Sequence, residues 1–443
     1  MRLLPPDLEV NETEGFDPQK DIFQRRQFGV SLAKVIENSN EGLVIGLDAK
    51  WGEGKSTFVK MWRGYLGSEE SGIASIYFDA FNNDYQRDPF YIIASEIYQL
   101  IEDRNPSLKE EFKEKAASAL KVISKIGLRL GVKTITAGVL DETIFEDDID
   151  SISDEITKAT RSFVADRLEE SKEDKQRVNE FKEFLSKLPE ILNTNKPVVI
   201  IVDELDRCRP DFALNIIETI KHFFSLPGIT FLLVLNKSQL EQSIKYQYGT
   251  AINASEYLQK FVNLWAILPS KVRGASSTVS VYAAYCLSQM EYKGERNSSG
   301  IFVDLAEYFQ LSLREIEQSL SNFALLENSG VRGDSFGSAC LSPFFSIVKV
   351  KYFDLYTEIS RGLRDYDRIE KEANIGALIN KGWANMTKPH PVKFCLFYCC
   401  TKDNQSQRAQ LDNELGNMNV SIFGCDSAID DIVPILNSFE QGI

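Results

Sequence analysis

Residues 42–62 read GLVIGLDAKWGEGKSTFVKMW. The first six, residues 42–47, are apolar and include the β-branched Val44 and Ile45, a pattern typical of a buried strand. Gly52 and Gly54 come directly afterwards, and from Phe58 onward the apolar residues recur at helical spacing. The stretch therefore predicts a strand, a tight glycine-rich turn and a helix in immediate succession.

The turn itself, from Ala49 to Ser56, has the residue pattern of a phosphate-binding loop. Glycines let consecutive N–H groups point at phosphate oxygens, and the N-terminal end of the following helix adds positive potential. In such a loop Lys55 reaches the β and γ phosphates and Ser56 is a ligand of Mg²⁺. Ala49 stands where glycine is usual, so a positive φ there would strain the loop. The expected nucleotide contacts are Lys50, Trp51, Gly52, Glu53, Gly54, Lys55, Ser56 and Thr57.

A second motif is the apolar run 198–202 followed by two acids, Asp203 and Glu204. A buried strand delivers these acids at its carboxyl end, the edge where α/β sheets bind ligands. Beside a phosphate-binding loop, Asp203 is expected to hold Mg²⁺, directly or through water. Glu204 is expected to polarise the water that attacks the γ-phosphate. An acidic turn exposed to solvent is the alternative interpretation.

A third polar residue, Asn236, follows the apolar stretch 231–235. If that strand neighbours the acidic one, its side chain emerges at the same sheet edge and is able to orient the attacking water. Asparagine is also a common turn residue, so the sequence leaves both interpretations open.

The wider pattern predicts strands near 42–47, 73–78, 198–202, 229–235 and 264–268, with helices at 21–38, 90–101 and 212–224 between them. Such alternation indicates an α/β fold with a mostly parallel sheet. The predicted division is residues 1–104 for the first part of the core, 105–190 for a helical insertion, 191–270 for the second part of the core, 271–330 for a helical lid and 331–443 for a C-terminal region of unassigned role. The fold is then a nucleotide-binding α/β core with an α-helical C-terminal region.

The insertion has no apolar run of about 18 residues, so no transmembrane helix is expected. Its most apolar part carries basic residues at four-residue intervals, which places them on one helical stripe: Lys121, Lys125, Arg129 and Lys133. This stripe is able to contact anionic lipid, nucleic acid or a partner helix, or to be an ordinary solvated face. The acidic segment 141–155 is a simpler partner within the same chain.

Composition limits the classes of function. The chain of 443 residues has 50 Lys+Arg and 65 Asp+Glu, a formal net charge of −15, which disfavours a general nucleic-acid coat protein. Seven irregularly spaced cysteines and a leader without an apolar stretch favour a reducing cytoplasm. His390, Cys395, Cys399 and Cys400 are close in sequence, but their spacing lacks a C-x₂-C pair and disfavours zinc.

Taken together, these motifs resemble the KAP family of P-loop NTPases, which have an extra strand between the two nucleotide motifs. The tryptophan before the loop glycine, the run 203–208 (DELDRC), the segment FDAF at 78–81 before Asp88-Pro89, and EYLQK at 256–260 match in order. Residues 312–316 (SLREI) resemble the helical lid of the family. Glu204 is a departure, because many members have a second aspartate there. The resemblance covers about residues 21–326. Many members carry membrane spans between the two nucleotide motifs, and none is expected in this chain.

The resemblance implies ATP and Mg²⁺ as ligands, and ATP hydrolysis in a nucleotide-dependent switch or assembly machine. Several bacterial members act against bacteriophage, so antiviral defence is an implied role. It also implies Arg314 as a lid arginine that senses the γ-phosphate, Arg25 or Arg26 beside the nucleotide base, and Lys260 as a cation acting across a subunit interface. A surface position is the alternative for each of these. Implied partners are a homo-oligomer that forms with nucleotide and proteins encoded nearby.

The expected catalytic set is thus Lys55, Glu204, Asn236 and Arg314, with Ser56 and Asp203 at the metal. Two other functions remain open. The first is a scaffold that binds nucleotide for stability and does not hydrolyse it, although a carboxylate following the metal aspartate disfavours this. The second is an ATPase stimulated by DNA, which the acidic net charge makes the weaker alternative.

Overall fold

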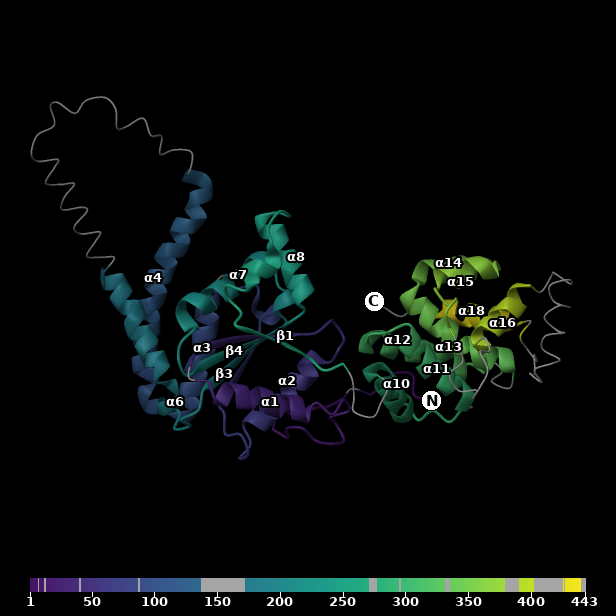
Figure 1. Ribbon diagram of the computed structural model, residues 1–443, viewed down its shortest axis with the longest axis horizontal. Helices are drawn as coiled ribbons and strands as arrows, with labels where there is room; N and C mark the ends of the chain where they lie inside the picture. Colours follow the sequence, from purple (N-terminus) through teal and green to yellow (C-terminus); the bar gives the residue numbers. More distant parts are fainter. Residues whose placement is uncertain are drawn as a thin grey trace, which may run out of the picture.

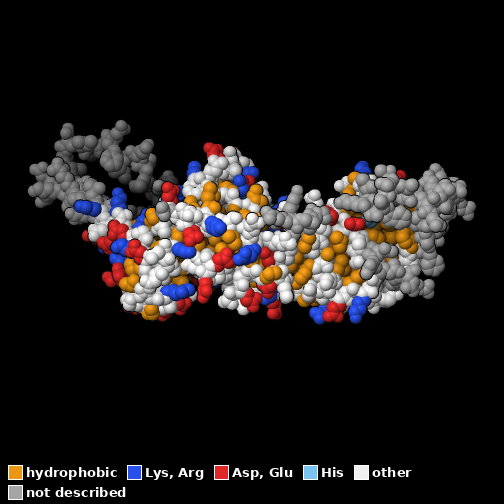
Figure 2. Space-filling view, turned by 60° about the horizontal axis from the view of Figure 1, so that its bottom comes forward, with side chains coloured by type: hydrophobic (Ala, Val, Ile, Leu, Met, Phe, Trp, Pro, Cys, Tyr) orange, Lys and Arg blue, Asp and Glu red, His pale blue; other side chains and the backbone are white. Residues whose placement is uncertain are grey.

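The computed structural model describes residues 1–136, 172–270, 277–294, 296–330, 335–378, 390–401, 425 and 427–439, apart from residues 7, 12, 40 and 87. For residues 123–136 and 296–297 it describes the backbone alone. Most of the basic stripe (Lys125, Arg129 and Lys133) and the whole acidic segment 141–155 therefore lie outside the described side chains. In the described part, an α/β core and a helical region lie side by side (Figure 1). On the face in Figure 2, acidic and basic side chains are interspersed over the core.

The core is built on five parallel strands in the order β2-β3-β4-β1-β5. Their bounds are β1 Leu43–Asp48, β2 Ser75–Asp79, β3 Val198–Asp203, β4 Ile229–Leu235 and β5 Leu264–Ile267. Strand β4 lies between β1, which leads into the glycine loop, and β3, which ends at the two acids. The predicted parallel sheet and its extra strand are thus confirmed.

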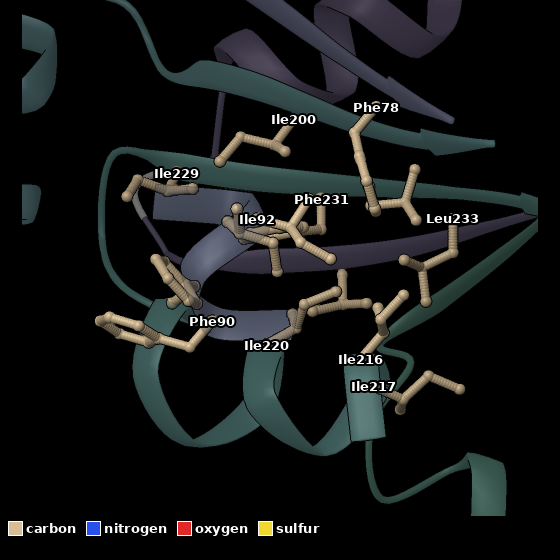
Figure 3. Packing of buried hydrophobic residues seen from close by; sticks show 14 of the residues in the cluster. Phe78, Phe90, Ile92, Ile200, Ile216, Ile217, Ile220, Ile229, Phe231 and Leu233 are labelled. Carbon is tan, nitrogen blue, oxygen red and sulfur yellow. The ribbon is translucent and has the colours of Figure 1, made fainter. Parts of the chain in front are cut away.

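The two faces of the sheet form two separate hydrophobic clusters, because alternate residues of a strand point to opposite faces. Ile200, Phe231 and Leu233 meet Phe90 of α3 and Ile216 of α7 on one face (Figure 3). The residues between them in sequence pack on the other face against α1 and α2: Val199, Ile201, Leu232 and Val234. The central strands β3 and β4 are buried along their whole length, as their continuous apolar runs predict.

Helices lie near the predicted ranges 21–38, 90–101 and 212–224 and directly after the glycine loop. Their bounds are α1 Arg26–Glu37, α2 Lys55–Leu66, α3 Pro89–Arg104, and α7 Pro210–Thr219 with the π-helical turn η5 Ile220–Phe224. Helices α8 Lys237–Tyr248 and α9 Ala254–Leu258 are additional. Helix α1 begins five residues later than the expected start at Asp21. The carboxylate of Asp21 accepts hydrogen bonds from the N–H groups of Arg25 and Arg26, and Gln24 has a φ of +52°, so the helix cannot extend further back.

The insertion projects from the core as helices. Helix α4 (Lys109–Thr136) lies beside the helical residues 172–186, and α6 (Leu188–Ile191) leads back to the sheet. The two long helices meet through aromatic side chains, with the ring centroids of Phe112 and Phe181 6.0 Å apart. Among the helices described, none is long and apolar enough to cross a membrane.

The helical region has a hydrophobic core of its own, to which residues on both sides of position 330 contribute. Its helices are α10 Thr278–Gln289, α11 Arg296–Tyr308, α12 Leu313–Asn328, α13 Phe336–Lys351, α14 Phe353–Ser360, α15 Tyr366–Glu372, α16 Pro391–Cys400 and α18 Ala428–Ser438. Helix α13 is buried from Gly337 to Val348 and forms the centre of this core. The predicted division between a lid and a C-terminal region at residue 330 remains a prediction.

The first residues of the chain connect the two regions. The N–H of Arg2 donates to the carbonyl oxygen of Met290 (2.8 Å), and the side chain of Asn328 donates to the carbonyl oxygen of Met1 (2.8 Å). Phe16, by contrast, packs in the core, with its ring centroid 5.8 Å from that of Phe58. Residues 1–16 thus span from the helical region to the core.

Candidate functional site

The glycine loop has the backbone of a phosphate-binding turn. Gly52 and Gly54 adopt φ values of +74° and +77°, which side chains with a Cβ atom rarely tolerate. Ala49 is absent from the described non-glycine residues with positive φ, so alanine at this position causes no backbone strain. Helix α2 begins at Lys55, directly after Gly54, so its free N–H groups face the edge where the strands end.

Lys55 folds over the loop. Its Nζ donates to the carbonyl oxygens of Ala49 (2.8 Å) and Lys50 (3.1 Å). Burial lowers the pKa of Lys55, while the nearby carboxylates of Asp206 and Asp203 favour its charged form. The ammonium group therefore lies between the loop and the acids that follow β3, where a phosphate chain would meet both.

The other loop residues differ in exposure. Glu53 bends back so that its carboxylate accepts from the N–H of Lys50 (2.9 Å), which closes the turn. Trp51 is 48 % exposed, and its indole N–H donates to the carboxylate of Asp206. Thr57, in the first turn of α2, is half-buried. The Trp51 contact ties the loop directly to the run 203–208.

Asp203 is fully buried beside the loop, and its carboxylate accepts hydrogen bonds from three groups. These are the N–H of Glu204 (2.8 Å), the hydroxyl of Tyr77 (3.2 Å) and the hydroxyl of Ser56. Burial raises the pKa of Asp203 above its ordinary value, and the three hydrogen bonds oppose that rise. Since carboxylate and hydroxyl oxygens are the ligands that Mg²⁺ prefers, Ser56 and Asp203 fit the predicted metal site.

Glu204 is held in a left-handed conformation with a φ of +58°, uncommon for a residue with a side chain. Its carboxylate accepts from the guanidinium of Arg207 (3.0 Å). Burial raises the pKa of Glu204, the Arg207 charge opposes this, and Asp203 and Asp79 add to it. The structure therefore brings Glu204 beside Asp203, with an arginine as its present partner.

Asn236 lies where β4 ends, beside both motif strands, and is buried. Its side-chain oxygen accepts from the hydroxyl of Ser238 (2.8 Å), which fixes the orientation of the amide. The next N–H, of Lys237, is bound by the Asp48 carboxylate at the end of β1 (2.9 Å). Asn236 is thus at the predicted sheet edge, and its role in orienting water stays a prediction.

The four arginine and lysine positions taken from the family resemblance lie in different surroundings. Arg25 is buried, and its guanidinium binds backbone carbonyl groups of the loop. Arg26 is exposed and pairs with Glu70 (2.7 Å). Arg314, in the first turn of α12, is exposed, and Lys260 lies over the ring of Tyr257 at 5.7 Å. None of the assigned roles is tested by these positions.

Helix α12 touches the loop. The N–H of Leu313 donates to the carbonyl oxygen of Gly52 (3.0 Å). A Cβ atom at Gly52 would lie 3.2 Å from the Cβ of Ser312, so glycine also permits this close approach. The helical region and the phosphate-binding loop are therefore in direct contact.

Two residues of the site were not anticipated from the sequence. Tyr77 and Asp79 lie at the end of β2, where Asp79 is the register partner of Asp203. The segment FDAF at 78–81 was noticed for its resemblance alone. Its acid directly after an apolar strand is the same signal that identified Asp203, and it would have pointed to Asp79.

The chain is similar to solved structures and to one protein family. The match to the ORC2 protein of Aeropyrum pernix, in its ADPNP-ADP complexes, covers 99 % of this chain and 98 % of that chain. The sequence identity is 13 % and the TM-score is 0.37. The match to the ORC1 protein of Aeropyrum pernix in complex with DNA covers 98 % of this chain and 86 % of that chain, with 12 % identity and a TM-score of 0.33. No curated protein matched the chain. The model of the KAP family P-loop domain, however, matches residues 25–369, so the chain belongs to the KAP family of P-loop NTPases.

Proposed function

We propose that this protein binds ATP with Mg²⁺ and hydrolyses it, and that it works as a nucleotide-dependent switch or assembly ATPase. One observation supports this most directly. The lysine and serine of the phosphate-binding loop lie at the same sheet edge as Asp203 and Glu204, and Ser56 is hydrogen bonded to Asp203. A site that only held nucleotide would not require the second acid.

In this proposal Lys55 leaves the carbonyl oxygens of Ala49 and Lys50 and binds the β and γ phosphates, where its charge stabilises the transition state. Mg²⁺, held by Ser56 and Asp203, would neutralise charge on the same phosphates. Glu204 orients the attacking water and takes its proton. Arg207 donates to Oε2 of Glu204, and a carboxylate with one such partner is still able to accept from water.

The useful output of the cycle is movement. Because α12 contacts Gly52, any shift of the loop on binding phosphate changes the contact between the loop and the helical region. Arg314 at the start of α12 is then the residue positioned to follow the γ-phosphate. A role in defence against bacteriophage, with partners encoded nearby, rests on family membership alone.

The test is phosphate release from ATP by the purified protein, measured beside Lys55→Ala and Glu204→Gln. We expect Lys55→Ala to weaken ATP binding about 100-fold or more, and Glu204→Gln to lower turnover by about 100-fold while ATP still binds. Lys60→Ala is a matched control, because Lys60 lies on the exposed face of the same helix.

The outcomes separate the candidate functions. Unchanged ATP binding by Lys55→Ala would contradict the site. ATP binding without turnover in the wild type would instead favour the scaffold that binds and does not hydrolyse. Repeating the assay with double-stranded DNA at low salt tests the DNA-stimulated alternative, which requires an increase in turnover.

A further inference from the structure

The buried guanidinium of Arg25 lies at the junction of three segments. Its Nη1 donates to the carbonyl oxygens of Glu53 (3.0 Å) and Gly54 (3.4 Å) in the loop. Its Nε and Nη2 donate to the carbonyl oxygen of Pro269 (3.3 and 3.0 Å), just after β5. The residue is 3 % exposed, and its partners are backbone carbonyl groups. Burying a charged group is costly unless hydrogen bonds and nearby charges compensate for the lost water, and these carbonyl groups supply the hydrogen bonds.

We propose that Arg25 is a positioning residue, which holds the phosphate-binding loop with its N–H groups toward the phosphates and ties the loop to Pro269. The proposal rests on the ATP-binding function proposed above. It goes beyond that function because it names a residue that acts on nucleotide through the loop backbone without touching the nucleotide.

The chemistry follows from the peptide unit. The carbonyl of Glu53 belongs to the same peptide group as the N–H of Gly54, and the carbonyl of Gly54 to that of the N–H of Lys55. In a phosphate-binding loop the N–H groups face the anion and the carbonyl groups face away. A cation bonded to those two carbonyls fixes the orientation of both peptide groups and polarises their N–H bonds toward the ligand.

The surroundings keep Arg25 in place and charged. The carboxylate of Asp21 fixes the backbone at the start of α1 through the N–H of Arg25 (2.8 Å). The ring of Phe23 lies 4.5 Å from the guanidinium, and Phe23 in turn packs on Tyr282 of α10, with ring centroids 5.9 Å apart. Burial lowers the pKa of Arg25 to about 10, which leaves it protonated at neutral pH. A cation therefore joins the loop, the end of the sheet and the helical region.

The experiment compares Arg25→Gln and Arg25→Lys with the wild type, using displacement of a fluorescent ATP analogue by ATP, GTP and inorganic tripolyphosphate. We expect Arg25→Gln to weaken the binding of ATP and of tripolyphosphate by the same factor, about tenfold or more. The ratio of ATP affinity to GTP affinity should not change. Arg25→Lys restores part of the loss, since an ammonium group keeps the charge but cannot reach both sites at once. Lys34→Gln, on the exposed face of α1, removes a charge without affecting either ligand.

Other results overturn the proposal. If Arg25→Gln weakens the binding of ATP but not that of tripolyphosphate, Arg25 acts at the nucleotide base, as the family resemblance implies. If Arg25→Gln changes the affinity for neither ligand, the contact of Arg25 with the loop has no role in binding. Should Arg25→Gln fail to fold, Arg25→Lys still decides, because equal losses for ATP and tripolyphosphate support positioning and a loss for ATP alone contradicts it. A wild type that binds neither ligand refutes the ATP-binding function itself, and this inference with it.

Discussion

The α/β core and the helical region bury different kinds of polar group. In the described part of the core, the buried charged residues are Asp21, Arg25, Asp203 and Asp206. In the described part of the helical region, the buried polar residues are serines, Asn322, Thr401 and His390, with no Asp, Glu, Lys or Arg among them. A buried charge is costly, so a protein keeps one where a function or a special contact requires it. The buried charges thus gather in the core, where the ATP site is proposed, and the described helical region is packed with apolar and uncharged polar groups.

Local hydrogen bonding explains how some serines of the helical region are buried. The hydroxyl of Ser346 donates to the carbonyl oxygen of Ser342, one helical turn earlier (2.7 Å). Ser335 caps the N-terminus of α13 in the same self-contained way. Such groups are satisfied within their own helix and need no ligand.

Placing a charge in the helical region should have the largest effect on stability. Asn322 is buried where α12 meets α13, and its amide donates to the carbonyl oxygen of Ser346 (3.4 Å). We expect Asn322→Asp to lower the free energy of unfolding by about 3 to 5 kcal/mol at pH 7, because burial disfavours a carboxylate and a carboxylate cannot donate to the carbonyl oxygen of Ser346. Chemical denaturation gives the value. Burial raises the pKa of the new acid, so the loss relative to wild type should shrink as pH falls. Full stability at pH 7 would show that this region tolerates charge.

Acid provides a second way to charge the helical region, through His390. It is buried, its Nδ1 accepts from the N–H of Val392 (3.3 Å), and burial lowers its pKa to about 4. The stability contributed by the neutral ring is complete above about pH 6.5 and is lost as pH falls toward 4, a change of about 3 kcal/mol. Melting curves of His390→Asn across this range should show a weaker dependence on pH. His222→Asn, at the exposed histidine of the core, should leave the dependence as it is.

Removing a charge from the core should have the opposite sign. Burial raises the pKa of Asp203, so its carboxylate destabilises the nucleotide-free fold at neutral pH. We expect Asp203→Asn to raise the melting temperature by about 2 to 4 °C and to abolish the stabilisation by ATP with Mg²⁺. Differential scanning fluorimetry with and without both ligands measures the two effects. Asp211→Asn, an exposed acid at the start of α7, is the control. A lower melting temperature for Asp203→Asn would mean that its hydrogen bonds outweigh its burial.

The smallest effect should arise where the two regions meet. The hydroxyl of Ser312 accepts from the N–H of Glu315 (3.3 Å), and the Glu315 carboxylate accepts from the N–H of Ser312 (2.7 Å). Loss of this cap in Ser312→Ala should cost about 1 kcal/mol and loosen the start of α12 against Gly52. We expect a small drop in melting temperature together with a two- to threefold change in ATP affinity. Ser329→Ala, at the other end of α12, should change the affinity less.

The sequence predicted the core well because its signals are local. Each strand is a short apolar run, and the glycine loop and the acidic strand end are contiguous motifs. The predicted start of α1 was too early. The Asp21 carboxylate sets the N-terminus of the helix through the N–H groups of Arg25 and Arg26, and helical periodicity does not reveal such a contact. The contacts of Arg25 could not be predicted, since Glu53 and Pro269 are 28 and 244 positions away in the chain. Periodicity predicts which side chains are buried, but it does not predict their long-range partners.

The bridge formed by residues 1–16 also bears on how the chain is made. Met1 and Asn328, which are hydrogen bonded, are 327 positions apart. At about 5 to 20 residues per second, a ribosome needs some tens of seconds between them. Phe16 and the sheet are able to fold during that time, whereas Arg2 must wait for Met290 and Met1 for Asn328 at the end of α12. The junction between the two regions is therefore completed late in synthesis, after the site that it serves has been translated.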